Sequence, residues 1–285
     1  MDERSDFRVM GIVNVTPDSF SDGGLYLDPA AAVAHGLELE AEGAAILDIG
    51  GESTRPGAEP VPAEVERERV VPVIEGLVAA DVRAQISIDT SKAAVAAAAL
   101  AAGATMVNDV TALRGDPEMA AVVEGAAADC CLMHMLGEPR TMQRDPTYED
   151  VVSEVKRFLV QRLSVAVDAG VPEQRIVLDP GIGFGKTTAH NLELLRRLDE
   201  LAAIGRPVLI GTSRKSFLGR LTGRPVDQRS AGTIATNVLA YERGARVFRV
   251  HEVATVHDAL TVAAATVRGA WDETTPTSSR ISTRT

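Results

Sequence analysis

Polar residues of a few chemical kinds recur along this chain, each at the end of a short β-rich run. In chain order they are Asn14, Asp48, Asp89, Asn108 with Asp109, His134, Asp179, Ser213 to Lys215, and Arg249 with His251. Any one of them could simply cap the turn or helix that follows, since Asp, Asn and Ser favour such positions. Eight in succession instead indicate side chains that converge on one site.

The first chemical set suits a planar, fused-ring heterocycle. It comprises Asp89, Asn108, Asp179 and Lys215. A carboxylate accepts two N–H groups from an amidine-like edge in bidentate fashion, and a ring carbonyl accepts from Lys or Asn. Each charge-assisted bond contributes roughly 1.5–3 kcal/mol.

Two further sets suit an anion and a hard metal ion. Arg249, His251 and Ser213 are cationic or donor-rich and follow the last two β-rich runs, where barrel enzymes commonly bind phosphate. Residues 216–221 could form the short extra helix that such sites use. Asn14 could offer a neutral oxygen to Mg²⁺, an ion that keeps several waters and is held in part by substrate phosphates.

Aromatic and histidine residues add to this interpretation. Phe20, Phe184 and Phe217 are expected in loops just past strand ends, where a flat ligand to stack on is one explanation and the pinning of loops is the other. No His-x-His follows the first strand and no zinc spacing occurs. The remaining histidines are expected on helices, in surface or packing roles: His35, His190 and His257.

The elements that must position these residues alternate regularly. The β-rich runs are residues 9–13, 45–49, 85–88, 106–107, 129–133, 176–178, 208–210 and 246–250. The intervening helices are expected at residues 30–42, 62–79, 91–102, 117–124, 149–169, 191–203, 232–243 and 255–270, with Asp28 and Ser91 as caps. Eight strand–helix units predict a parallel (β/α)8 TIM barrel. A doubly wound sheet is the alternative, but it needs a glycine-rich dinucleotide fingerprint after the first strand, which is missing.

Composition bounds the fold and the partners. The 285 residues are 45% hydrophobic but only 4% aromatic, so the core must consist of Ala, Val, Leu and Ile. We expect one barrel domain over residues 1–272 and a disordered tail over 273–285. Neighbouring Cys130 and Cys131 should point to opposite faces of a strand as buried thiols.

Charge and hydropathy exclude some partners. The formal net charge of −11 and the scattered Lys and Arg residues argue against nucleic acid. No apolar run reaches the roughly 20 residues of a membrane span, and the first residues hold no signal-peptide core. We therefore expect no membrane partner and a cytoplasmic location.

Eight motifs together resemble the dihydropteroate synthase family, in order and over residues 9–270. They are GIVNVTPDSFSDGG (11–24), DIGGESTRPGA (48–58), SIDTSK (87–92), VNDV (107–110), LMHMLGEPRTMQ (132–143), LDPGIGFGKT (178–187), TSRKSFLG (212–219) and FRVHEV (248–253). The resemblance implies the condensation of 6-hydroxymethyl-7,8-dihydropterin pyrophosphate with 4-aminobenzoate in folate synthesis, with Mg²⁺. The resemblance also implies a homodimer through late helices and an aminobenzoate site that sulfonamides occupy as well.

The resemblance also implies residue roles. Asp89, Asn108, Asp179 and Lys215 would read the pterin. The pyrophosphate would meet Asn14, Thr54, Arg55, Arg249 and His251, with Arg249 and Mg²⁺ stabilising the departing diphosphate. Loops 16–24 and 54–62 would close over the substrates, with Asp18 and Asp48 holding them in place. The aminobenzoate site would consist of Phe20, Pro56, Phe184, Lys215 and Ser216. Glu252 departs from the family pattern, which more usually has Asp, but lies outside these expected contacts.

Three other functions stay open at this point. A pterin-binding methyltransfer barrel shares the pterin-reading residues but needs a corrinoid partner and lacks the two loops. A Schiff-base aldolase could use Lys215, although Arg214 and Ser213 do little to desolvate it. A degenerate relative kept for binding or assembly is disfavoured by the intact polar set.

Overall fold

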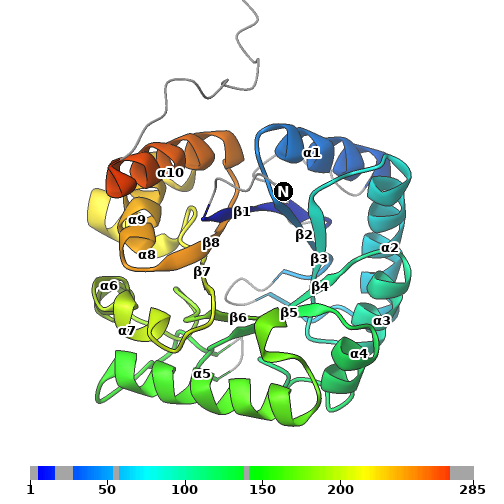
Figure 1. Ribbon diagram of the computed structural model, residues 1–285, viewed down its shortest axis with the longest axis horizontal. Helices are drawn as coiled ribbons and strands as arrows, with labels where there is room; N and C mark the ends of the chain where they lie inside the picture. The colour runs from blue at the N-terminus through cyan, green and yellow to red at the C-terminus, as the bar shows by residue number, and fades with distance from the viewer. Residues whose placement is uncertain (1–5, 17–27, 54–57, 138–140, 270–285) are drawn as a thin grey trace, which may run out of the picture.

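The computed structural model describes residues 6–16, 28–53, 58–137 and 141–269, and eight parallel strands among them close into a barrel in chain order (Figure 1). The strands are β1 (Arg8–Asn14), β2 (Ile46–Gly50), β3 (Gln85–Asp89), β4 (Met106–Asp109), β5 (Asp129–Met133), β6 (Ile176–Asp179), β7 (Val208–Ile210) and β8 (Ala245–Val250). The predicted TIM barrel is therefore confirmed. The predicted first and last residues of each strand differ from the observed ones by at most two positions.

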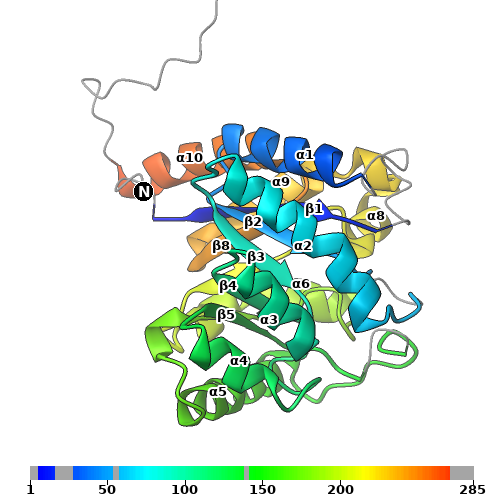
Figure 2. The ribbon, with the colours of Figure 1, turned by 90° about the vertical axis from the view of Figure 1, so that its right-hand side faces the viewer.

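Helices surround this barrel on all sides (Figure 1). They are α1 (Pro29–Ala41), α2 (Ala63–Ala79), α3 (Ala93–Ala101), α4 (Met119–Gly125), α5 (Val151–Asp168), α6 (Thr188–Arg196), α7 (Leu198–Ala202), α8 (Ser216–Thr222), α9 (Ser230–Glu242) and α10 (Val253–Arg268), with 3-10 turns η3 (Glu173–Arg175) and η4 (Val226–Gln228). The side view shows α1 to α4 lying next to one another along one flank (Figure 2).

The alternation of side chains along each strand produces two separate cores. One residue from each of seven strands fills the barrel interior: Met10, Ile46, Met106, Cys131, Val177, Leu209 and Val247. Neighbouring strand residues such as Leu47 and Cys130 belong instead to the larger core beneath the helices. Cys130 and Cys131 thus lie on opposite faces as buried free thiols, as predicted.

Helix caps agree with the sequence in one case and differ in another. Asp28 caps α1, where its side chain accepts from the Ala30 amide at 3.0 Å. Ser91 does not cap α3: the Ala93 amide donates instead to Asp116, which follows β4, at 2.9 Å. The cap is supplied across the interface between neighbouring units, a relationship that local sequence does not reveal.

One predicted helix is two. Residues 191–203 form the end of α6 and all of α7, separated at Arg197, whose backbone leaves the helical range. Arg197 there makes ion pairs with Asp150, Glu193 and Glu200. The predicted start also moves back to Thr188, because Thr187 and His190 form a capping box.

One placement was wrong. Phe217 was expected in a loop, either stacked on a ligand or pinning the loop, but it lies in α8 and is 2% exposed in the core beneath the helices. On α2, the charged residue Glu66 is fully buried, whereas the apolar Val65 is exposed. Glu66 is held there by Lys92, whose ammonium lies 2.5 Å from its carboxylate.

Within the residues that the structure describes, no helix is long and apolar enough to cross a membrane. The predicted tail, residues 273–285, lies outside the described residues. The domain boundary at residue 272 therefore stays a prediction.

The interior layer leads to a stability prediction. Met10 is completely buried there, so Met10→Ala should lower the free energy of unfolding by about 2–5 kcal/mol through lost burial and an unfilled cavity. Chemical denaturation measures the change. Val160→Ala, at an α5 position that is 46% exposed, is the control and should change stability by no more than about 0.5 kcal/mol. Equal effects of the two changes would contradict the interior packing.

Candidate active site at the barrel mouth

The polar side chains of the site continue the inward-facing rows of the barrel. Asp48, Asn108, Asp179 and Arg249 each stand two positions beyond a residue of the apolar interior layer. Alternation therefore points them to the same side, at the carboxyl ends of the strands. Asp89 ends β3 in register with Gly50 of β2 and Asn108 of β4. The carboxylates and the amide are all at least nine-tenths buried.

Arg249 joins three strands at this mouth. Its Nε donates to Asp48 Oδ2 at 2.6 Å, and its Nη2 donates to Asp89 Oδ2 at 2.7 Å. Asp48 also accepts from Asn108 Nδ2 at 3.0 Å and from Ser87 Oγ at 2.7 Å. These three partners of Asp48 all lie on barrel strands. Asp48 therefore holds other residues of the site in position.

This network changes one expectation. The sequence suggested a heterocycle-reading set apart from a cationic, anion-binding set. In the structure Arg249 of the second set is hydrogen-bonded to Asp89 of the first. A change at Arg249 should therefore affect both ends of a bound ligand.

Burial sets the protonation behaviour of these groups. It raises the pKa of Asp89 to about 7, with Arg249 opposing the shift and Asp48 adding to it. It likewise raises the pKa of Asp179 to about 6, opposed by the Gly181 amide, which donates to Asp179 Oδ1 at 2.7 Å, and by nearby lysines. Burial alone would lower the pKa of Arg249, but Asp48 and Asp89 outweigh it and raise that pKa. The carboxyl groups of Asp89 and Asp179 therefore both have pKa values close to neutral pH.

The anion-binding set is also brought together. Ser213 Oγ lies 2.9 Å from His251 Nδ1 and accepts from the His251 amide at 3.2 Å. The expected extra helix is confirmed as α8, which begins at the exposed Ser216. Glu252, expected outside the ligand contacts, forms an ion pair of 3.1 Å with Arg214, which links the loops after β7 and β8.

Lys215 and Phe184 face each other across the loops after β6 and β7. The Lys215 ammonium lies 4.1 Å from the centre of the Phe184 ring, a cation–π contact. Gly183, with φ at +83°, sits beside this pair, and a Cβ there would come within 3.2 Å of the Lys215 side chain. A glycine is needed here for both the backbone and the space.

Asn14 ends β1 opposite Gly50, half-buried at the same mouth. A Cβ built on Gly50 would lie 3.8 Å from both Asn14 Oδ1 and Asp89 Oδ2, so two oxygens flank one small space. Among the described residues, no group of three or more His, Cys, Asp and Glu side chains could hold a metal ion. A hard cation here would therefore depend on Asn14, water and the ligand's own oxygens.

Sequence reasoning missed a second lysine of the site. Lys186 appeared in the sequence only as part of a motif, but in the structure it is 2% exposed and contacts His134. The carbonyl of its neighbour Gly185 accepts from the Tyr148 hydroxyl at 2.8 Å. A charged residue at the end of a glycine-rich loop was the available signal. Five predicted site residues lie outside the described residues: Asp18, Phe20, Thr54, Arg55 and Pro56.

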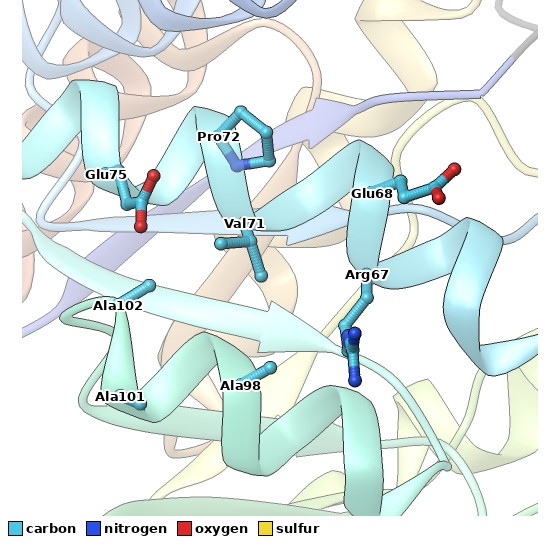
Figure 3. Close-up of a pocket in the computed structure, with 8 residues that line it drawn as sticks. All are labelled: Arg67, Glu68, Val71, Pro72, Glu75, Ala98, Ala101 and Ala102. Atoms are coloured by element: carbon cyan, nitrogen blue, oxygen red, sulfur yellow. The ribbon is translucent and has the colours of Figure 1, made fainter.

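A groove of about 480 Å³ lies elsewhere, on the outer helical layer between α2 and α3 (Figure 3). Its lining mixes small apolar side chains of α3 with charged and apolar ones of α2: Arg67, Glu68, Val71, Pro72, Glu75, Ala98, Ala101 and Ala102. It shares no residue with the barrel mouth and is not part of the candidate site.

Comparison with known proteins agrees with this geometry. The family described as "Pterin binding enzyme" matches residues 10–251. The dihydropteroate synthase of Mycobacterium leprae is 48% identical over 272 residues, which is 93% of each chain. A Xanthomonas albilineans dihydropteroate synthase structure with 4-aminobenzoic acid is 54% identical, with a TM-score of 0.86 over 93% of this chain and 94% of that one. A second structure from this organism, in complex with 7,8-dihydropteroate, is 51% identical with a TM-score of 0.82 and the same coverage.

The Arg249 network predicts a pH-dependent loss of stability. Arg249→Met leaves Asp48 and Asp89 buried without their cation, which should cost about 3 kcal/mol of unfolding free energy at pH 8. The cost should be smaller at pH 5: loss of the cation raises the pKa of Asp89 further, so the folded protein takes up a proton there and one charge is relieved.

Denaturation at the two pH values measures this difference. Arg197→Met is the control, because the carboxylates that pair with Arg197 are partly exposed and screened by water, and its cost should be clearly smaller. An Arg249→Met cost that is the same at pH 5 and pH 8 would show that the guanidinium does not balance these carboxylates.

Proposed function

The chain belongs to the family of pterin-binding enzymes, and we propose that it condenses 6-hydroxymethyl-7,8-dihydropterin pyrophosphate with 4-aminobenzoate to give 7,8-dihydropteroate and pyrophosphate. It is a transferase. Relatives that match over nearly their whole length are named dihydropteroate synthase, and a similar structure holds 7,8-dihydropteroate. The observation that carries the proposal is the buried Asp89–Arg249–Asp48–Asn108 network beside Asp179 at the barrel mouth.

The pterin end of the substrate needs acceptors for N–H groups and donors for a ring carbonyl. Asp179 and Asp89 are the acceptors, and Asn108 and Lys215 are the donors. Arg249 and Asp48 support this set from below, because they fix Asp89 and Asn108 before any ligand binds. Such preorganisation lowers the cost of ordering side chains on binding.

The diphosphate end meets Arg249, His251 and Ser213. In the reaction, the bond between the pterin methylene carbon and the diphosphate oxygen breaks, and its electron pair leaves with the diphosphate. The amine of 4-aminobenzoate then forms a C–N bond to that carbon and loses a proton. Positive charge at Arg249 stabilises the negative charge that develops on the leaving group. Thr54 and Arg55 remain predicted contacts of the same diphosphate.

We propose that Mg²⁺ assists this step. Asn14 would hold it together with the diphosphate oxygens, since a neutral amide oxygen at the barrel mouth suits a hard cation. The bound ion would supply further charge neutralisation for the diphosphate.

The 4-aminobenzoate ring is proposed to lie near Phe184 and Lys215, whose cation–π pair offers an aromatic face and a positive charge for the carboxylate. Ser216 begins α8 next to them. Phe20 and Pro56 remain predicted parts of the same site.

A cytoplasmic location and a homodimer are further parts of the proposal. Exposed apolar side chains on the late helices support the dimer, with Leu239 on α9 and Val262 and Val267 on α10 all more than two-fifths exposed. A monomeric mass by light scattering would contradict it.

Pyrophosphate release tests the function directly. The purified protein should release pyrophosphate from the dihydropterin substrate with Mg²⁺, and 4-aminobenzoate should couple that release to dihydropteroate formation. Omission of Mg²⁺ tests the metal. Tight pterin binding without release would instead favour the methyltransfer or degenerate function.

Asp179 gives the sharpest test of the pterin site. Asp179→Asn should weaken pterin binding by about 10- to 100-fold, since a charge-assisted hydrogen bond is replaced by one with a poorer acceptor. In the unchanged protein, affinity should fall as the pH drops below 7 and further below 6, because burial raises the pKa of Asp89 to about 7 and that of Asp179 to about 6, and each protonated carboxyl loses an acceptor.

Calorimetry with a pterin ligand measures both effects. The matched control is Asp129→Asn, because Asp129 lies at the opposite, amino end of β5, where it accepts from Gln85. That variant should bind the pterin normally. Unchanged affinity in Asp179→Asn would refute the assignment.

A further inference from the structure

Lys186 is buried at the barrel mouth within reach of three acceptors. Its Nζ lies 2.9 Å from His134 Nδ1, 3.0 Å from the Phe184 carbonyl and 3.3 Å from the His134 carbonyl. An ammonium has three donors and no acceptor, so this set suits the protonated side chain. Burial lowers the pKa of Lys186 to about 7, opposed by Asp179, so the ammonium is the main form below that pH. The chain has only four lysines, and this one is the most buried of them, at 2% exposure.

His134 completes the arrangement as a neutral acceptor. Burial, with added repulsion from Lys186 and Arg114, lowers the pKa of His134 to about 2. Its ring packs edge-on against Phe158 at 4.8 Å between centroids. Because Nδ1 faces an ammonium, the ring proton is assigned to Nε2.

These bonds join two loops that approach very closely. His134 follows β5, and Phe184 lies in the loop after β6. A Cβ on Gly181 would lie only 1.9 Å from the His134 carbonyl oxygen, so the loops touch backbone to backbone. Further bonds hold the second loop: the Gly183 amide donates to Asn191 Oδ1 at 2.8 Å, and the Tyr148 hydroxyl donates to the Gly185 carbonyl at 2.8 Å.

The Phe184 ring depends on this loop for its position. Its backbone carbonyl is fixed by Lys186, while its ring packs beside Met133, Met135 and Met142 and faces the Lys215 ammonium. A shift of the carbonyl would move the ring relative to Lys215. Lys186 therefore acts on the site without facing the substrate itself.

We infer that Lys186 is a positioning residue that sets the 4-aminobenzoate site, by using its buried ammonium to tie the Phe184 carbonyl to His134. This inference rests on the proposed function, since the Phe184–Lys215 pair is the proposed place of the aromatic amine. Lys186 also acts on Asp179 through its charge, but the hydrogen bonds that hold Asp179 and Asp89 come from the Gly181 amide and Arg249, so the position of the pterin end should depend on Lys186 less.

Lys186→Met keeps the length of the side chain and removes the ammonium. It should raise KM for 4-aminobenzoate about tenfold, as expected for the loss of buried charge-assisted bonds, and leave KM for the dihydropterin substrate within about twofold. Lys156→Met, on the outer helix α5, removes a lysine away from the site and should change neither constant. Equal rises in both KM values, or none, would overturn the inference.

Two variants at His134 keep the test decisive if Lys186→Met fails to fold. His134→Leu removes one acceptor and should raise the aminobenzoate KM by a few-fold. His134→Asn places an amide oxygen near the position of Nδ1 and should restore a value close to that of the unchanged protein. No difference between the Leu and Asn variants would contradict the role of this hydrogen bond.

Hydrogen exchange separates this inference from the proposed function. In Lys186→Met, or in His134→Leu, the Gly183 and Phe184 amides should exchange faster, while the β3 and β6 amides keep their protection. Faster exchange throughout the barrel would mean general destabilisation and would overturn the positioning role. If the unchanged protein released no pyrophosphate, the proposed function would fail. The exchange result would still show whether Lys186 holds the loop of Gly183 and Phe184 in place.

Discussion

The balance of buried charge around Arg249 is the constraint on which the site depends. Two carboxylates, Asp48 and Asp89, are almost fully enclosed at the barrel mouth, and one guanidinium reaches both. Removing that cation would leave buried negative charge without a partner, which is strongly destabilising. The same contacts fix the relative positions of β2, β3 and β8, and Asn108 adds β4 through Asp48. A network that satisfies its own charges can thus hold a substrate edge in a set geometry.

The barrel makes this network possible through a simple repeat. Alternation along each strand first directs an apolar residue inward and then, two positions later, a polar one: Val177 and then Asp179, Val247 and then Arg249. The apolar layer below excludes water from one side of the carboxylates, which is why burial dominates the pKa of both Asp89 and Asp179. Packing and electrostatics at this site are therefore consequences of the same strand geometry.

The sequence predicted this repeat but not the partners across the barrel. Strand ends, the barrel, α8 and the opposite faces of Cys130 and Cys131 all follow from period-two patterns and short-range signals, and all are confirmed. Contacts between distant units do not follow from such signals. Arg249 meets Asp48 from 201 positions away, and Asp116 replaces Ser91 as the cap of α3. Phe217 was misplaced for the same reason, because burial on a helix as short as α8 depends on what packs over it.

The raised pKa values of Asp89 and Asp179 also show how binding and stability oppose each other here. A carboxyl whose pKa is higher in the folded than in the unfolded protein contributes less to stability as the pH rises from about 4 to 7. Burial of these two carboxyl groups therefore lowers the stability of the fold at neutral pH. N–H donors of a bound heterocycle would favour the ionised carboxylates and return part of that free energy. The site should therefore bind such a ligand more strongly than its hydrogen bonds alone suggest, since binding also relieves a charge that folding has buried.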